Sequence, residues 1–329
     1  MNDGRPSADR DKLRVYAGSA NPRLSAAVAE RLGLPLGGRQ LRRHPDGEIH
    51  VQLDESVRGT DCYVIQSTGP PVNEHIMELL VFLDALRRGS AGWITAIIPY
   101  YGYARQEKKS TGREPITARL IADLLTAAGA NRVVSLDLHA PAIQGFFNIG
   151  MDHLTAVPIL AEYLLSRQYP DGVVVAPDLG RVKLADRFAS ALGLPLAIIH
   201  KRRLSDVRTQ ASAVVGEVEG RTPIVVDDMI STGGTVLEAV RALVERGARP
   251  AVTVVATHGL FVGPAVEWLR HPAITEIVVT DTLELPPERR PERLRVLSVA
   301  DLLAQAIERL HHQQSISALF PPKYGQQPV

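Results

Sequence analysis

The chain has 329 residues, of which 45% are hydrophobic and 22% charged, as in folded globular proteins and unlike disordered or fibrous ones. At roughly 150 residues per domain, this length predicts two domains. The 37 Lys and Arg residues are balanced by 36 Asp and Glu, so no global positive field exists to bind nucleic acid or anionic lipid. Because only six of the basic residues are lysines, the position of each lysine is informative.

The single cysteine excludes an internal disulfide bond and a multi-cysteine zinc site, which favours a reducing compartment. Cys62 precedes Tyr63, Val64 and Ile65, so we expect a buried thiol on a strand rather than a nucleophile. No stretch approaches the roughly 18 apolar residues of a membrane span, and residues 1–12 are polar. We therefore expect a cytoplasmic protein without membrane contact, beginning with a disordered tail over residues 1–12.

Short β-branched runs alternate with amphipathic stretches from residue 13 to about residue 310, which predicts an α/β fold of mostly parallel sheets flanked by helices. The strands expected in the first half are Leu13–Ala17, Cys62–Gln66, Trp93–Pro99 and Val133–Asp137. Between them, Ile49–Leu53 alternates apolar and polar residues, as an antiparallel, half-exposed strand does. Asn73 is a candidate cap for a helix reaching Gly89, and Glu114 with Pro115 is expected to open another.

The second half repeats this alternation of strands and helices. Its expected strands are Val173–Pro177, Leu196–Ile199, Ile224–Asp227, Val252–Ala256 and Ile277–Thr280. The least periodic stretch between the halves is Gly145–Asp152, so the domain boundary is expected just after it. We expect an N-terminal domain over residues 13–157, a C-terminal domain over residues 158–310 and a C-terminal segment over residues 311–329. Each domain is then long enough to bury its own core.

The strongest local signal follows the apolar strand at Ile224–Val226. Two carboxylates come next, and a turn of small residues then leads into a helix. Glycines let backbone N–H groups approach an anion, hydroxyls add donors, and the helix N-terminus favours negative charge. Carboxylates at the carboxyl end of a parallel strand accept hydrogen bonds from vicinal sugar hydroxyls. The pattern predicts a pentose 5-phosphate site made of Asp227, Asp228, Ser231, Thr232, Gly233, Gly234 and Thr235.

An ordinary βα turn is the alternative interpretation of this segment, since Asp, Ser and Gly are common in turns. An apolar strand, two acids and five small loop residues in register favour phosphate binding over that alternative. Neither G-x-x-x-x-G-K-[ST] nor G-x-G-x-x-G occurs in the chain. Walker-type and Rossmann-type nucleotide sites therefore have no support.

Polar side chains also follow other expected strands. Arg105 and Gln106 suit a purine nucleotide, the cation for phosphate oxygens and the amide for base or ribose edges. His139 and Asp178 suit a divalent cation that is held partly through water, as Mg²⁺ usually is. We expect these strand ends to lie at the carboxyl edge of each parallel sheet, where ligands bind.

Two further cations, Lys201 and Arg203, begin a polar loop after the strand expected at Leu196–Ile199. Such a loop can close over a phosphorus centre and neutralise the charge that develops there. Four of the six lysines fall in or beside the candidate segments, which argues against a purely solvated role for them.

The acidic pair and the turn Ser231–Thr235 resemble the phosphoribosyl-pyrophosphate binding motif of phosphoribosyltransferase-fold proteins, which make or consume that compound. Further segments in this order favour making it, namely His44–Glu48, Pro99–Lys109, Asp137–His139, Ala176–Gly180 and His200–Arg203. From about residue 13 to residue 320, the chain resembles the ribose-phosphate pyrophosphokinases of the phosphate-activated bacterial class. The resemblance implies two phosphoribosyltransferase-type domains, each a mostly parallel sheet flanked by helices.

This resemblance implies transfer of the diphosphoryl group of Mg-ATP to the anomeric hydroxyl of ribose 5-phosphate, giving 5-phosphoribosyl 1-diphosphate and AMP. Mg²⁺ is the implied cofactor, with His139 and Asp178 as its ligands. Lys201 and Arg203 would stabilise the transition state, and Arg203 would also bind ribose 5-phosphate. The residues implied to bind ATP are Asp46, Glu48, Arg105 and Gln106.

Family members form hexamers in which the Asp46–Glu48 turn of one subunit would complete the ATP site of another, so a homohexamer is expected. Inorganic phosphate and ADP are the expected effectors. The chain departs from the family pattern at four positions. His44 replaces an aromatic Phe beside the adenine, Ser231 replaces a frequent Asp, and Arg181 and Lys183 replace small residues. The two extra cations are expected to alter the response to phosphate or nucleotide.

Two other functions remain open at this point. A phosphoribosyltransferase would need a hood that recognises a nucleobase, and no segment supplies one. A non-catalytic regulatory homologue would be expected to lose the catalytic loop, which is intact here. Tyr100, Tyr101 and Tyr103 are expected to pack rather than to stack on a base. The remaining histidines are expected to be structural or exposed, namely His50, His75, His153, His258, His271, His311 and His312.

Overall fold

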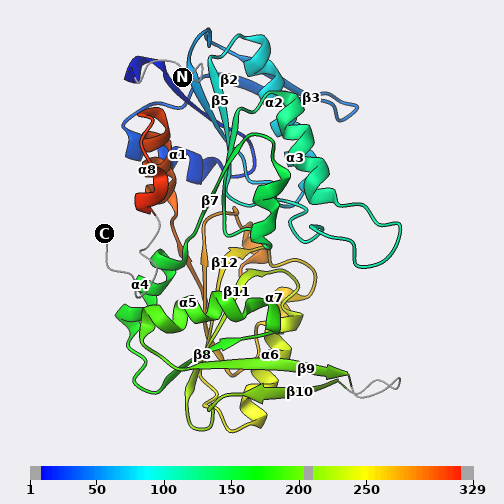
Figure 1. Ribbon diagram of the computed structural model, residues 1–329, viewed down its shortest axis with the longest axis vertical. Helices are drawn as coiled ribbons and strands as arrows, with labels where there is room; N and C mark the ends of the chain where they lie inside the picture. Colours follow the sequence, from blue (N-terminus) through cyan, green and yellow to red (C-terminus); the bar gives the residue numbers. More distant parts are fainter. Residues whose placement is uncertain (1–8, 204–209, 320–329) are drawn as a thin grey trace. The chain divides into compact units, whose positions relative to one another are not determined.

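The computed structural model describes residues 9–203 and 210–319, and for residues 201–203 and 210–212 it describes the backbone alone. The described chain forms two compact units (Figure 1). The first contains residues 9–155, 282–284 and 298–319, and the second contains residues 156–281 and 285–297. The domain boundary expected after residue 157 therefore lies two residues inside the second unit, which begins at residue 156.

The first unit is built on a parallel sheet, as its apolar strands predicted. In spatial order, its strands are β1 (Leu13–Ala17), β4 (Asp61–Ile65), β5 (Trp93–Ile98), β6 (Arg132–Leu136) and β7 (Gly150–Leu154). The sequence did not predict strand β7, which begins inside the least periodic stretch and ends at Leu154. Cys62 is fully buried on β4, and burial raises the pKa of its thiol to about 12, so it is not a nucleophile.

A separate antiparallel hairpin joins β2 (Arg39–Arg43) to β3 (Ile49–Leu53). The half-exposed β3 confirms its alternating pattern. The sequence did not predict β2, because RQLRR has too few apolar residues to look like a strand. His44–Glu48 forms the tip of this hairpin.

The helices of the first unit are α1 (Pro22–Leu32), α2 (Val72–Arg88), α3 (Thr117–Ala128) and α8 (Ala300–His311). Helix α2 begins one residue before Asn73, with Pro71 at its cap, so the expected Asn73 cap is wrong. Helix α3 begins at Thr117, so Glu114 and Pro115 precede the helix. The Glu114 carboxylate closes the preceding loop, where it accepts a hydrogen bond of 2.7 Å from the Ser110 N–H and one of 2.8 Å from the Thr111 hydroxyl.

Helix α8 corrects the expected domain division, which placed it in the C-terminal domain. It packs against α1 in the first unit, where Arg31 forms an ion pair with Asp301 (Figure 1). Farther along α8, Nδ1 of His311 lies 2.9 Å from Oδ2 of Asp61, and both side chains are almost fully buried. Helix α8 therefore completes the core of the first unit.

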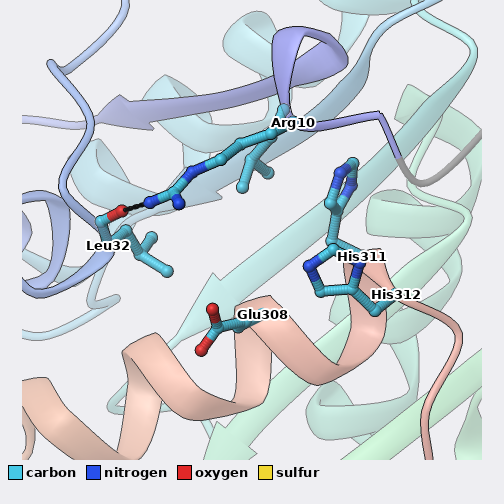
Figure 2. A pocket seen from close by; sticks show the side chains of 6 residues that line it. Arg10, Leu32, Glu308, His311 and His312 are labelled. Atoms are coloured by element: carbon cyan, nitrogen blue, oxygen red, sulfur yellow. Dashed lines mark hydrogen bonds between the residues drawn. The ribbon is translucent and has the colours of Figure 1, made fainter.

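Residues 9–12 are ordered, which corrects the expectation of a disordered tail there, whereas residues 1–8 lie outside the described residues. The short 3₁₀ helix η1 (Arg10–Lys12) is held because Arg10 donates a hydrogen bond to the Leu32 carbonyl (Figure 2). Figure 2 shows Arg10, Glu308, His311 and His312 around a cavity of about 20 Å³, which has room for a single water molecule.

The second unit contains a wider sheet. Its spatial order is β10 (Gln210–Val215), β9 (Leu196–Arg203), β8 (Gly172–Ala176), β11 (Thr222–Ile230), β12 (Val252–Gly259), β13 (Ile274–Thr280) and β14 (Leu294–Leu297). All neighbours in this order are parallel except β9 and β10. Strands β8 and β12 are buried throughout, as in parallel sheets that are covered on both faces.

The helices of the second unit are α4 (Val157–Arg167), α5 (Val182–Leu192), α6 (Gly234–Glu245) and α7 (Ala265–Trp268). Helices α4 and α5 pack together, with α5 against β8 and β11, while α6 packs on β10 and β11 (Figure 1). Short 3₁₀ helices elsewhere are η2 (Pro141–Phe146), η3 (Leu179–Arg181), η4 (Pro287–Arg289) and η5 (Ile316–Leu319). The predicted fold class, two domains each with a mostly parallel sheet flanked by helices, is confirmed.

Candidate functional site

The acidic pair lies on β11, which runs to Ile230, three residues beyond the end expected from the sequence. The side chains of Asp227 and Asp228 are only 11% and 5% exposed. Arg181 bridges them, with its Nε 3.2 Å from Oδ1 of Asp227 and its Nη1 3.4 Å from Oδ1 of Asp228. Oδ1 of Asp227 also accepts a hydrogen bond of 2.8 Å from the backbone N–H of Asp228.

Burial raises the pKa of Asp227 well above its usual range, and the hydrogen bond and charge of Asp228 raise it further. The Arg181 guanidinium acts in the opposite direction and favours the ionised carboxylate. Carboxylates accept several hydrogen bonds each, so this pair can receive donors from a neutral polyol. Such an arrangement suits the hydroxyls of a sugar.

The turn after β11 leads directly into α6. Gly233 precedes this helix with a φ of +80°, a backbone conformation that favours glycine. A Cβ at Gly234 would lie 3.1 Å from the Trp268 ring. The N–H groups of the first turn of α6 have no acceptor within the helix, and among the described side chains none caps it. The turn Ser231–Thr235 therefore presents donors to an anion, as the sequence predicts.

Asp178 is the second residue beyond β8, and it caps η3. Its Oδ1 accepts a hydrogen bond of 3.2 Å from the backbone N–H of Arg181. Through Arg181, the second unit thus brings Asp178 close to the acidic pair. The sequence noted Arg181 as an added cation and did not foresee this link, because its partners lie about fifty residues away in the chain.

Lys201 and Arg203 lie on β9, which continues past its expected end at Ile199 because β10 pairs with it. The register places Lys201 opposite Ser212 and Arg203 opposite Gln210. The polar loop therefore begins later than expected. The side chains of Lys201 and Arg203, and residues 204–209, lie outside the described part of the chain.

In the first unit, hydrogen bonds with Thr68 fix the loop after β5. The Thr68 hydroxyl donates a hydrogen bond of 2.9 Å to the Tyr100 carbonyl and accepts one of 2.6 Å from the Gly102 N–H. A Cβ on Gly102 would lie 2.5 Å from the Thr68 carbonyl oxygen, so glycine is required at this close approach. Tyr100 and Tyr101 are buried, which confirms that they pack in the core.

Arg105 and Gln106 follow on this fixed loop, and both are exposed. The Gln106 side-chain oxygen accepts a hydrogen bond of 2.6 Å from the Thr117 hydroxyl. Its backbone N–H donates to the Tyr103 carbonyl at 2.9 Å. The amide of Gln106 is therefore oriented, while the Arg105 guanidinium faces solvent.

Asp46 and Glu48 lie at the exposed tip of the β2–β3 hairpin. Oδ1 of Asp46 accepts a hydrogen bond of 3.1 Å from the Glu48 N–H, and Gly47 between them has a φ of +97°. The His44 ring packs edge-to-face on His50, with centroids 5.7 Å apart. Among the described contacts of this unit, none joins the turn to Arg105 or Gln106.

His139 is half-buried just after β6. The preceding residue, Leu138, donates its backbone N–H to Nε2 of His153 on β7, at 2.8 Å. His153 therefore has the structural role expected of it, and it fixes the loop that carries His139. No local signal in the sequence indicates this contact, because it joins a side chain to a backbone group 15 residues away.

Among the residues that the structure describes, no three His, Cys, Asp or Glu side chains lie close enough to hold a metal ion between them. Mg²⁺ usually takes one or two protein ligands and fills its shell with water and substrate phosphates. His139 lies in the first unit and Asp178 in the second, and their role as metal ligands stays a prediction.

A larger hollow of about 310 Å³ lies in the second unit, where residues at the amino ends of its strands, including Thr222 and Thr253, line it. It also includes Arg167, Tyr169 and Arg249. None of the site residues predicted from the sequence lines it. Ligands of open α/β sheets bind at the carboxyl ends of the strands, which is where Asp227 and Asp228 lie.

Comparison with known proteins identifies the family. Residues 13–129 match the N-terminal domain of ribose phosphate pyrophosphokinase, and residues 207–321 match the phosphoribosyl synthetase-associated domain. The chain is 51% identical over 308 residues to the ribose-phosphate pyrophosphokinase of Bacillus subtilis (strain 168), covering 94% of this chain and 97% of that protein. It is 50% identical over 311 residues to that of Caldanaerobacter subterraneus subsp. tengcongensis, covering 94% and 98%.

A solved structure agrees with this similarity. The phosphoribosylpyrophosphate synthetase from Mycobacterium smegmatis superimposes with a TM-score of 0.87 at 47% identity. The match covers 92% of this chain and 99% of that one, so both described units are included. The chain belongs to the ribose-phosphate pyrophosphokinase family.

Proposed function

We propose that this protein transfers the diphosphoryl group of ATP to the anomeric hydroxyl of ribose 5-phosphate, giving 5-phosphoribosyl 1-diphosphate and AMP. The observation that carries the proposal is the buried acidic pair of Asp227 and Asp228 beside the turn Ser231–Thr235. It occurs in a chain that matches ribose-phosphate pyrophosphokinases over 94% of its length. The protein is thus a transferase of nucleotide biosynthesis.

The ribose 5-phosphate site is proposed on the second unit. Asp227 and Asp228 would accept hydrogen bonds from the vicinal hydroxyls of the ribose. The 5-phosphate would bind to the backbone and hydroxyl donors of Ser231, Thr232, Gly233, Gly234 and Thr235, where the N-terminus of α6 favours a dianion. Arg203 would add a positive charge to this site.

The ATP site is proposed on the first unit. Arg105 would pair with phosphate oxygens, and Gln106, oriented by Thr117, would hydrogen-bond the base or ribose. Asp46 and Glu48 would bind ATP from the hairpin tip of a neighbouring subunit. Their exposure on a turn with no described contact to Arg105 is consistent with a role across an interface.

In the reaction, the anomeric oxygen forms a bond to the β-phosphorus of ATP and releases its proton to solvent. The bond between the β-phosphorus and the oxygen that bridges it to the α-phosphorus breaks, and AMP leaves with that oxygen. Lys201 and Arg203 would stabilise the negative charge that builds up on the transferring group. Transfer of this kind depends on positioning and charge neutralisation rather than on a covalent nucleophile. Bound Mg²⁺, held by His139 and Asp178, would neutralise charge on the polyphosphate.

We also propose a homohexamer, with inorganic phosphate and ADP as effectors. Ile116, Leu120 and Leu124 are 37%, 53% and 39% exposed, and their four-residue spacing aligns them along one face of α3. Such an apolar row is typical of a surface that another subunit covers.

Among the described residues, no helix combines the length and the apolar character needed to cross a bilayer. The lone buried thiol supports a cytoplasmic location.

The decisive experiment mixes the protein with ATP, Mg²⁺ and ribose 5-phosphate and measures the adenine nucleotides formed. AMP is the expected product, and ADP or no product would contradict the proposal. Repeating the assay with and without phosphate and ADP tests the effectors. Pyrophosphate released when a nucleobase is added to phosphoribosyl pyrophosphate would instead indicate a phosphoribosyltransferase, and a regulatory homologue would give neither product.

A further inference from the structure

Arg181 occupies an unusual place beside the acidic pair. It ends η3 and directly precedes α5, and its side chain is only 14% exposed. One guanidinium reaches both carboxylates, at 3.2 Å from Asp227 and 3.4 Å from Asp228. A planar group with several fixed N–H donors is suited to bridging two acceptors in this way.

The backbone of Arg181 is fixed as well. Its N–H donates to Oδ1 of Asp178 at 3.2 Å, and Asp178 caps the short helix that Arg181 ends. The guanidinium therefore extends from an anchored point, and it reaches residues of β11 whose own backbone is held by β12. Both ends of the ion pair are positioned by the fold.

Two adjacent buried carboxylates repel one another when both are ionised. Arg181 opposes this repulsion, and its charge offsets part of the rise that burial and Asp228 cause in the pKa of Asp227. It makes one described ion-pair contact with each carboxylate. A carboxylate has about four acceptor positions, so one contact with Arg181 does not use them all.

We propose that Arg181 is a positioning residue for ribose recognition, which holds Asp227 and Asp228 aligned to accept hydrogen bonds from two vicinal hydroxyls. This inference rests on the proposed function, since it deepens the description of the same pentose 5-phosphate site. Arg181 acts through the two carboxylates and not on the reacting atoms. Lysine would restore the charge but not the planar bridge.

The test measures binding of ribose 5-phosphate to the full-length protein by calorimetry, without ATP. Arg181→Gln is expected to weaken binding about tenfold, because a charge-assisted bridge is lost. Arg181→Lys is expected to weaken it about threefold, since only the charge is kept. Arg187→Gln is the matched control, because it removes an exposed cation of α5 that has no assigned role and should leave affinity within about twofold.

A second arm uses 2-deoxyribose 5-phosphate, which lacks one of the hydroxyls. If Arg181 acts through the carboxylates, removing the hydroxyl costs the wild type more affinity than it costs Arg181→Gln, because the two changes disrupt one interaction. A merely structural role would give equal penalties in both proteins. Equal penalties, or an Arg181→Gln variant that binds ribose 5-phosphate as well as or better than the wild type, would overturn the inference.

Steady-state assays separate this inference from the proposed activity. In Arg181→Gln, KM for ribose 5-phosphate should rise while kcat and KM for ATP change by less than about twofold. A wild type that binds ribose 5-phosphate but forms no AMP refutes the proposed activity, and the binding arms still decide the role of Arg181. If Arg181→Gln does not fold, Arg181→Lys decides, and unchanged affinity in that variant overturns the inference.

Discussion

The two units present their candidate residues in opposite ways. In the second unit, Asp227 and Asp228 lie on a core strand, nearly buried and already bridged by Arg181. In the first unit, Asp46, Glu48 and Arg105 lie on exposed turns whose backbones are well held. A buried polar site must satisfy its groups before any ligand arrives, whereas an exposed one is satisfied by water. If the proposed function is correct, the sugar site is preformed, whereas substrate or a second subunit completes the nucleotide site.

The prediction with the largest expected effect tests whether a residue of the second unit stabilises the transition state. Lys201→Ala should lower kcat by about 100- to 1,000-fold, because a cation that neutralises developing charge is lost. AMP formation measures the loss, and size-exclusion chromatography should show unchanged assembly. Arg187→Ala, at an exposed cation of α5, serves as the control, with near-normal activity expected. Full activity in Lys201→Ala would contradict the role assigned to this residue.

The next effect probes the preformed sugar site itself. Asp228→Asn should raise KM for ribose 5-phosphate about 30-fold, equivalent to about 2 kcal/mol, because a charged acceptor is replaced by a neutral amide. KM for ATP should stay constant, since the nucleotide candidates lie on other elements. Asp186→Asn, at an exposed carboxylate on α5, is the control. An equal rise in both KM values would show that the two sites are not separate.

A smaller effect is expected at the exposed nucleotide loop. Arg105→Ala should raise KM for ATP about tenfold and leave KM for ribose 5-phosphate unchanged, because a solvated cation contributes less than a buried group. Arg119→Ala removes another exposed arginine, on α3, where it pairs with Asp123. If both variants behave alike, Arg105 has no particular role in ATP binding.

The smallest effect concerns stability without substrate. Because the pKa of Asp227 is raised in the folded state, that state holds the proton more tightly than the unfolded chain does. Stability should therefore fall as the pH rises from the ordinary Asp pKa of 3.8 to the folded value, and the loss persists above it. Asp227→Asn should raise the free energy of unfolding at neutral pH by on the order of 1 kcal/mol.

Thermal unfolding of the unliganded protein at several pH values measures this effect. The matched variant Asp46→Asn changes an exposed carboxylate of the hairpin tip and should stay within about 0.5 kcal/mol of the wild type. A destabilised Asp227→Asn variant, or an equal gain in Asp46→Asn, would show that burial of the acidic pair has no cost. The buried carboxylates of the second unit would then affect stability no differently from the exposed carboxylates of the first unit.

The parts of the fold that follow local patterns could be predicted from the sequence. β1 begins and ends at the expected residues, because all its residues except the half-buried Arg14 are apolar and buried, as in a strand covered on both faces. β2 and β14 were missed because they are short and rich in arginine or exposed. α8 was placed in the wrong unit because its partners, α1 and Asp61, lie more than 200 residues away.

The candidate site shows the same limit. Asp227, Asp228 and the turn after them form one continuous segment, so a local pattern identifies them. The bridge from Arg181 joins segments about fifty residues apart, and no local pattern encodes such a contact. The roles of Lys201 and Arg203 stay predictions, because their side chains lie outside the described residues.

Helix α8 also bears on how the chain folds during synthesis. Multidomain proteins generally fold from the N-terminus as they emerge from the ribosome. Here the first unit lacks α8, and with it the partner of Asp61, until residue 311 has been translated. The described residues of the second unit end at residue 297 and emerge before that. Among the described residues, the unit that begins first is therefore finished last, and a truncation within α8 damages the core of the first unit.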